Sequence, residues 1–78
     1  MSLNNVVIIT KNNCIYCNKA KQFFKMNDID FCEKEIETDI SREDVFRLYP
    51  NQKTIPIIIV NEEMIGGYDE FISWYFSR

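Results

Sequence analysis

The apolar residues of this chain form blocks whose spacing changes between that of strands and that of helices. Continuous runs rich in β-branched residues at Val6–Thr10 and Ile55–Val60 predict two buried strands. Ile29–Ile36 alternates imperfectly between apolar and polar residues and predicts another strand, and Met64-Ile65 predicts a short one. Pro56 stands where the second apolar run begins, a position at which a sheet tolerates proline.

Three other segments have helical spacing. The first begins at Cys14, with Asn13 as its predicted N-cap. The second follows Ser41, which together with Asp44 resembles a capping box, and it stops at a proline. The third covers Tyr68–Phe76, directly after two glycines. The apolar face of the first helix consists of Cys17, Ala20, Phe23 and Phe24.

The predicted order of elements is β-α-β-α-β-β-α. A β-α-β unit requires a parallel, right-handed crossover, and the short link between the last two strands requires an antiparallel hairpin. The fold class is therefore α/β, with a four-stranded mixed sheet and helices on both of its faces. At 78 residues, 46% of them hydrophobic, the chain is predicted to form a single domain over residues 1–78.

The net charge of −3 conceals an uneven distribution of charged residues. Residues 1–27 contain no acid, whereas residues 28–44 contain eight acids against Lys34 and Arg42. The acidic balance argues against nucleic-acid binding. Lys11 brings positive charge close to Cys14, which favours a thiolate and anionic thiol substrates. The solvated face of the first helix is expected to consist of Lys19, Lys21 and Lys25.

No apolar stretch is long enough to span a membrane, and the N-terminus lacks a basic segment followed by a long apolar region. We therefore expect a cytoplasmic protein that does not enter the membrane. In the reducing cytosol a C-x-x-C motif is catalytic or metal-binding more often than it is structural.

Such a motif, Cys14-Ile15-Tyr16-Cys17, lies where a strand passes into a helix. The unpaired N–H groups at the helix N-terminus favour negative charge, so the pKa of the Cys14 thiol is expected to be lowered, and the turn is expected to expose it. Cys17, one turn into the helix, is expected to be less exposed and less acidic. A zinc half-site is the alternative, but the chain has no His and only Cys32 besides, so redox chemistry is favoured and no metal is predicted. Cys32 is expected to be a packed or spectator thiol.

Three motifs together resemble those of the glutaredoxin family. Lys11-Asn12-Asn13-Cys14-Ile15-Tyr16-Cys17 is similar to the family's K-x-x-C-P-Y-C. Lys53-Thr54-Ile55-Pro56 is similar to its [RK]-T-V-P, and Gly66-Gly67-Tyr68-Asp69 to its G-G-x-D. Since all three stand at the expected spacing, the chain resembles a glutaredoxin over essentially its whole length. The resemblance implies a thioredoxin-like fold.

The resemblance also implies a glutathione-dependent disulfide oxidoreductase without a bound cofactor. Cys14 would be the nucleophile and Cys17 the resolving thiol, while a cis bond before Pro56 would turn the Ile55 backbone outward to pair with glutathione as an added strand. At the last helix N-terminus, backbone N–H groups would suit the γ-glutamyl carboxylate and Asp69 its ammonium. The groove for glutathione would be lined by Lys11, Tyr16, Thr54, Ile55, Pro56, Gly67, Tyr68 and Asp69.

Further partners follow from the same resemblance. They are disulfide-containing proteins, with ribonucleotide reductase as a usual client, and a thioredoxin or glutathione reductase system that supplies electrons. The chain lacks the extra terminal helices of larger members and is expected to be a monomer. Ile15 replaces the usual proline between the cysteines, which is similar to small phage-type glutaredoxins and leaves the redox potential open.

Two other functions stay open at this stage. A dimer that shares an iron–sulfur cluster through Cys14 and two glutathiones is conceivable without proline at position 15, although Cys17 would compete with the cluster. The second alternative is a thioredoxin-type reductant that receives its electrons from a reductase. Thioredoxins usually carry Trp before the first cysteine and Gly-Pro between the two, where this chain has Asn13 and Ile15-Tyr16.

Overall fold

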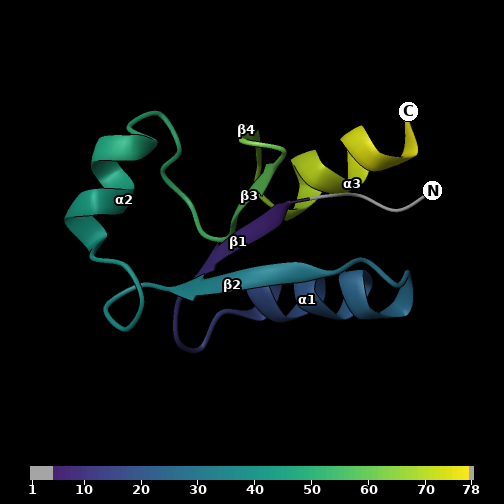
Figure 1. Ribbon diagram of the computed structural model, residues 1–78, viewed down its shortest axis with the longest axis horizontal. Coiled ribbons are helices and arrows are strands. Elements are labelled where there is room, and N and C mark those ends of the chain that lie inside the picture. Colours follow the sequence, from purple (N-terminus) through teal and green to yellow (C-terminus); the bar gives the residue numbers. More distant parts are fainter. Residues whose placement is uncertain (1–4, 78) are drawn as a thin grey trace.

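The computed structural model describes residues 5–77, in which seven elements follow the predicted order (Figure 1). Residues 1–4 and 78 of the predicted domain lie outside this range. None of the helices within residues 5–77 is long and apolar enough to cross a membrane. The elements are β1 (Val6–Thr10), α1 (Ile15–Met26), β2 (Phe31–Glu35), α2 (Arg42–Leu48), β3 (Ile57–Val60), β4 (Glu63–Gly66) and α3 (Tyr68–Phe76).

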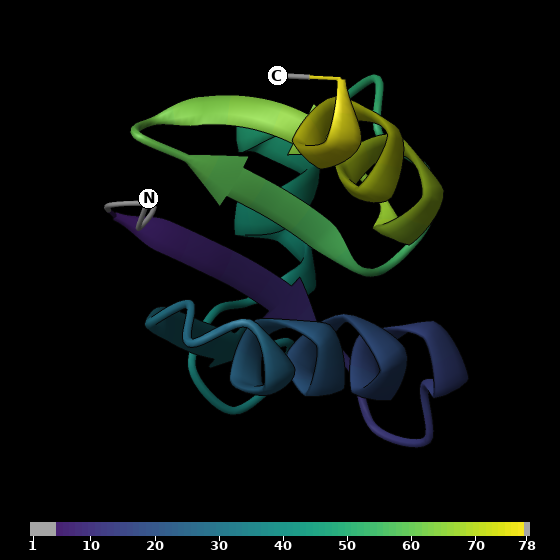
Figure 2. The same ribbon diagram turned by 90° about the vertical axis from the view of Figure 1, so that its right-hand side faces the viewer.

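The four strands form one mixed sheet in the order β2-β1-β3-β4. β1 runs parallel to β2, with Val6 opposite Phe31, and antiparallel to β3, with Val6 opposite Val60. β3 and β4 form the predicted antiparallel hairpin. Figures 1 and 2 show α1 and α3 on one face of the sheet and α2 on the other, which confirms the predicted mixed sheet covered by helices on both faces.

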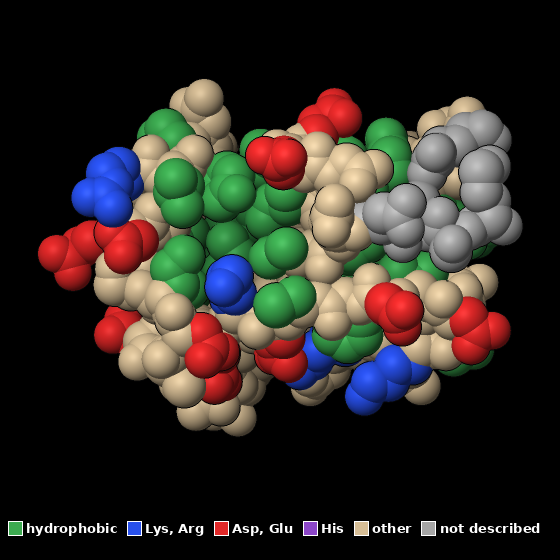
Figure 3. Space-filling view, viewed as in Figure 1, with side chains coloured by type: hydrophobic (Ala, Val, Ile, Leu, Met, Phe, Trp, Pro, Cys, Tyr) green, Lys and Arg blue, Asp and Glu red, His purple; other side chains and the backbone are tan. Residues whose placement is uncertain are grey.

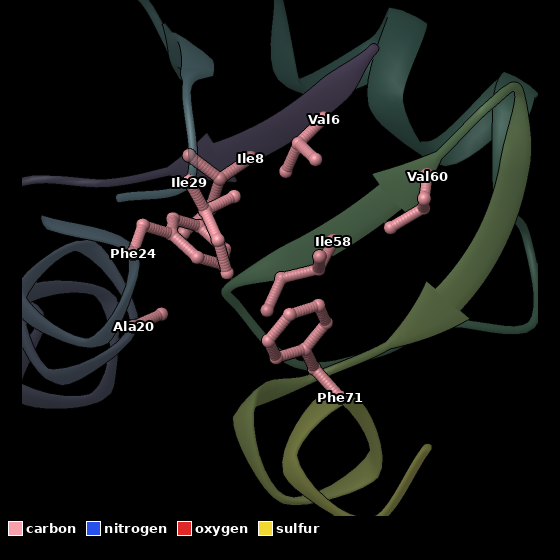
Figure 4. Packing of buried hydrophobic residues seen from close by; sticks show 8 residues of the cluster. All are labelled: Val6, Ile8, Ala20, Phe24, Ile29, Ile58, Val60 and Phe71. Carbon is pink, nitrogen blue, oxygen red and sulfur yellow. The ribbon is translucent and has the colours of Figure 1, made fainter. Parts of the chain in front are cut away.

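Each face of the sheet has its own apolar core. The larger core joins α1, α3 and the sheet, and its centre is the pair Phe24 and Phe71, both fully buried, with ring centroids 5.2 Å apart (Figure 4). The smaller core joins the sheet to α2 through Val45. Because β1 and β3 lie in the middle of the sheet, their side chains are covered on both faces, and this explains the continuous apolar runs in the sequence.

The fold corrects one sequence-based expectation for Cys32 and one for the start of α2. Cys32 is exposed and not packed, because it lies on β2, an edge strand of the sheet, and its role as a spectator thiol stays a prediction. The capping box predicted for α2 is only half present. The hydroxyl of Ser41 accepts the N–H of Asp44 at 3.0 Å, but the Asp44 carboxylate binds Arg47 one turn further along the helix.

A small polar cluster links α1 to the sheet just before the C-x-x-C segment. The buried Thr10 hydroxyl donates to Glu33 Oε2 at 2.7 Å, and Lys21 Nζ lies 3.0 Å from the same oxygen. Lys21 is therefore paired and half-buried rather than part of a freely solvated face, whereas Lys19 and Lys25 are exposed as expected. The hydrogen bond from Thr10, more than the charge of Lys21, holds the pKa of Glu33 below its usual value of 4.5.

This cluster predicts an acid-sensitive contribution to stability. Because the folded pKa of Glu33 is lowered, its contribution is present above the unfolded value and is lost as the pH falls through the folded value. We expect Glu33→Gln to lower the free energy of unfolding at pH 7 by at most about 1 kcal/mol, since partly exposed pairs are screened by solvent. Urea denaturation at several pH values should show the difference from wild type shrinking below pH about 4.5.

The matched control is Glu63→Gln, which removes an exposed carboxylate that has no ion pair within residues 5–77. Its effect on the unfolding free energy should be close to zero at every pH. A Glu33→Gln deficit that stayed constant from pH 7 to pH 3 would show that the amide packs badly and that the ionised carboxylate is not the stabilising species.

Candidate active site at the start of helix α1

The C-x-x-C segment closes the loop between β1 and α1. Cys14 and Cys17 form a disulfide, with their Cα atoms 5.2 Å apart. The prediction that Asn13 is the N-cap of α1 is wrong. The φ of Asn13 is 55°, in the left-handed region, whereas an N-cap residue has an extended backbone. Cys14 takes that place with φ −112° and ψ 111°, and its Sγ accepts the backbone N–H of Cys17 at 3.2 Å. The reactive sulfur itself thus caps the helix.

The two cysteines differ in exposure in the expected order. Cys14 is 8% exposed and Cys17 is 1% exposed. The expectation that the turn leaves Cys14 open is nevertheless wrong for this disulfide state, because the Cys14 Sγ lies 3.8 Å from the carbonyl oxygen of Ile55. The Ile55 segment, which belongs to the second sequence motif, therefore lies against the Cys14 sulfur of the first motif.

A groove of about 270 Å³ adjoins this segment and gathers residues from three parts of the chain. Seven of the eight residues predicted to line a glutathione groove line this one, and the Ile55–Pro56 bond is cis as predicted. Tyr16 is 53% exposed, and its ring centroid lies 6.0 Å from that of Tyr68. The lining residues are Tyr16, Thr54, Ile55, Pro56, Gly67, Tyr68, Asp69 and Glu70.

Lys11 is the predicted residue that the structure places elsewhere. It lines a separate hollow together with Arg42, on the side of the active-site loop that faces the start of α2. Its predicted contact with glutathione stays a prediction. The first motif thus supplies Tyr16 to the groove and places Cys14 beside Ile55, but its lysine does not line the groove.

Glu70 is the lining residue that the sequence analysis missed. Its Oε1 accepts the backbone N–H of Gly67 at 2.9 Å, so one of the N–H groups expected to receive a carboxylate is already occupied. The spacing of three residues from the N-cap to a glutamate is the signal that could have identified it.

Gly66 must be glycine, because its φ is +136° and an added Cβ would lie 2.7 Å from the Glu70 Cβ.

The groove has a negative electrostatic character. The residues that line it include the carboxylates of Asp69 and Glu70 and no Lys or Arg. Lys19, the nearest cation to Tyr16 on α1, lies with its Nζ 5.3 Å from the centre of the Tyr16 ring. Within residues 5–77 there is no cluster of three His, Cys, Asp or Glu side chains that could hold a metal ion. The arrangement suits a ligand that carries an ammonium group and presents sulfur to Cys14.

Comparison with known proteins identifies the family. The model of the glutaredoxin family matches residues 6–65, which include both cysteines and the Ile55–Pro56 segment. The chain belongs to the glutaredoxin family. It is 30% identical to Glutaredoxin 3 of Escherichia coli over 66 residues, which cover 85% of this chain and 80% of the relative. It is 35% identical to mouse mitochondrial Glutaredoxin-2 over 72 residues, but spans only 45% of that relative.

Solved glutaredoxin structures have the same fold. Glutaredoxin 1 of Francisella tularensis, complexed with cacodylate, is 34% identical with a TM-score of 0.76, over 94% of this chain and 93% of that one. Reduced E. coli glutaredoxin is 27% identical with a TM-score of 0.78, over 100% and 96% of the two chains. A buckwheat glutaredoxin–glutathione complex has a TM-score of 0.78 at 19% identity, over 92% and 68%, and shows the likeness of fold alone.

Membership of this family gives the Cys14–Cys17 pair its chemistry. Glutaredoxins are thiol–disulfide oxidoreductases, and a pair of thiols three positions apart at the start of a helix is the group that such exchange requires. A thiolate at Cys14 would receive the Cys17 N–H that its sulfur accepts in the disulfide state. The structure thus shows the oxidised form of a redox pair whose Cys14 lies against Ile55, a residue that lines the groove.

Proposed function

We propose that this glutaredoxin uses glutathione as its reducing co-substrate and acts on protein disulfides and glutathione mixed disulfides. The observation that supports this most directly is the groove beside Cys14, where the Ile55 backbone and the first turn of α3 lie opposite Tyr16. An extended tripeptide can pair with such a backbone as an added strand. Its sulfur would reach Cys14 while its γ-glutamyl end lies at α3.

The γ-glutamyl end is the part of glutathione that the groove suits best. Its ammonium group would meet the exposed carboxylate of Asp69. Its carboxylate would meet the first N–H groups of α3, which have no partner within a helix. The N–H of Gly67 already donates to Glu70. The γ-glutamyl carboxylate would therefore accept the N–H groups of Tyr68 and Asp69.

This assignment predicts the kinetic effect of Asp69→Asn. The variant should raise the Michaelis constant for glutathione by about tenfold and change turnover much less, because a contact made equally in the bound ground state and in the transition state affects binding alone. Steady-state reduction of a small mixed disulfide at varied glutathione concentration measures both constants.

Asp28→Asn is the matched control, since Asp28 lies just beyond the C-terminal end of α1 and its φ of 56° is one that asparagine tolerates. It should leave both constants unchanged. If Asp69→Asn lowered turnover and left the Michaelis constant alone, Asp69 would be a helix-capping residue and the γ-glutamyl end would lie elsewhere.

The same assay separates the proposal from the thioredoxin-type alternative. We expect glutathione with glutathione reductase to support turnover, and NADPH with thioredoxin reductase not to.

Ribonucleotide reductase as a client, a monomeric state and a cytoplasmic location belong to the proposal as well. Anaerobic reconstitution with iron and sulfide, followed by visible absorbance and gel filtration, tests the iron–sulfur alternative and is expected to yield no clustered dimer.

A further inference from the structure

A second hollow, larger and more apolar than the glutathione groove, lies between α2 and the segment that leads to β3. Its volume is about 480 Å³, and its apolar walls are Ile36, Val45, Phe46 and Ile55. Figure 3 shows hydrophobic side chains beside α2 on the face turned towards the viewer, so the surface around this helix is partly apolar. Lys53, Arg42 and Glu43 stand around these walls. An apolar centre with a polar rim is the usual composition of a protein–protein contact.

Phe46 is the apolar residue of this hollow whose side chain is not buried in the core. It is 66% exposed, whereas its neighbour Val45, which attaches α2 to the sheet, is 6% exposed. Leu48, 58% exposed on the same helix, lines a different hollow beside Val7 and Tyr49. The two large apolar side chains of α2 therefore line two separate hollows. The hollow lined by Phe46, called the Phe46 hollow below, is also lined by Ile55.

Ile55 connects the Phe46 hollow to the reacting sulfur. It lines both this hollow and the glutathione groove, and its carbonyl oxygen lies 3.8 Å from Cys14 Sγ. A polypeptide cysteine that bonds to Cys14 Sγ comes close to Ile55. One residue of extended chain covers about 3.3 Å, so side chains a few positions from that cysteine come within reach of the hollow.

We propose that the Phe46 hollow binds an apolar side chain of the polypeptide substrate, within about five residues of the cysteine that Cys14 attacks. The occupant is an extended segment of a disulfide-containing protein with a Leu-sized side chain at that position. This inference rests on the proposed action on protein disulfides at Cys14 and not on the proposed use of glutathione. It adds a surface that selects among protein disulfides.

The exchange that this contact would favour needs no further reactant. The Cys14 thiolate attacks one sulfur of the peptide disulfide, the Cys14–peptide bond forms, and the other peptide sulfur leaves as a thiolate. Cys17 then attacks the Cys14 sulfur and releases the second peptide thiol. The peptide disulfide gains two electrons and two protons, and the enzyme ends as the Cys14–Cys17 disulfide seen in the structure.

The test uses the full chain, reduced beforehand, as the stoichiometric reductant without glutathione. The substrates are disulfide-linked peptide dimers in which one Leu is moved through the five positions on each side of the cysteine, and an all-Ser version is the reference. We expect one Leu position to react about tenfold faster than the reference, as burial of one Leu side chain allows. Phe46→Ser should reduce this preference to about twofold or less.

Leu48→Ser is the matched control, because it removes an equally exposed apolar side chain from the same helix but from the other hollow. It should keep the Leu preference. Both variants should reduce hydroxyethyl disulfide, which is too small to reach the hollow, at the wild-type rate. Because glutathione is absent from this assay, its outcome is independent of the Asp69→Asn result.

Three outcomes would overturn the inference. The first is a wild-type protein that reacts equally with all peptides. The second is equal loss of the Leu preference in Phe46→Ser and Leu48→Ser. The third is a wild-type dimer in sedimentation that Phe46→Ser converts to a monomer, because the hollow would then hold a second copy of this chain instead of a substrate.

Discussion

Cys14→Ser is expected to reduce both the removal of glutathione from mixed disulfides and the reduction of protein disulfides to the uncatalysed background. Cys17→Ser is expected to keep most of the first activity and to lose most of the second. Serine cannot attack a disulfide at neutral pH, and Cys14 is the thiol whose sulfur receives a backbone N–H and keeps the larger exposed fraction. We therefore expect every exchange to begin at Cys14.

The difference between the two activities comes from the second step. When a protein disulfide is attacked, we expect the mixed disulfide to be resolved by Cys17, which is buried one turn into α1 next to Cys14. When the substrate is a glutathionylated thiol, free glutathione can release the enzyme instead. Parallel assays with a glutathionylated peptide and a protein disulfide measure the two activities.

Cys32→Ser is the control for this pair of variants. Cys32 is an exposed thiol on β2 and is not part of the disulfide, so its removal should leave both activities unchanged. If Cys17→Ser lost both activities to the same extent, glutathione would not resolve the intermediate. A thioredoxin-type reductant would then be the better description of this chain.

The second large effect is expected in the core. Phe71→Ala should lower the free energy of unfolding by about 3–5 kcal/mol, the usual cost of removing a buried aromatic ring. Phe71 is fully buried, and it packs edge-on against Phe24, so it holds α3 and α1 on the same face of the sheet. Small domains have total stabilities of about 5–15 kcal/mol, so this loss is a large fraction of the whole.

Urea denaturation followed by circular dichroism, with wild type and variant in the same redox state, measures this loss. Phe76→Ala is the control, because Phe76 lies on the same helix but is 70% exposed, and its loss should cost about 1 kcal/mol or less. Similar losses in the two variants would show that α3 is held by its outer aromatic residues and that the Phe24–Phe71 contact is not its main attachment.

The sequence determined the fold to a large extent because its local patterns agree with one another. The predicted strands Val6–Thr10 and Ile55–Val60, the second of which is shorter in the structure (Ile57–Val60), are apolar runs, and such strands have to lie in the middle of a covered sheet. The connection through α1 then had to be a crossover, and the short link to β4 had to be a hairpin. Helix α3 has the predicted bounds Tyr68–Phe76 because Gly66 and Gly67 interrupt the chain before it.

The sequence also determined most of the site, for a different reason. Cys14, Ile55 and Asp69 are far apart in the chain, and no local pattern says that they meet. Their meeting was predicted from the three motifs that resemble a family. The structure then placed seven of the predicted residues in one groove, whereas Lys11, from the same motif as Cys14, came to lie along another hollow.

What only the tertiary structure decided concerns contacts between elements and the exposure that results from them. The segment before β3 covers the Cys14 sulfur, and Glu70 occupies the Gly67 N–H. The position of β2 at the edge of the sheet leaves Cys32 exposed. Phe46 and Val45 are adjacent apolar residues on α2, but only Val45 faces the sheet, because a helix turns about 100° per residue and the sheet covers one side of it. Apolar spacing fixes which residues share a face, whereas the packing of distant segments fixes which faces are covered.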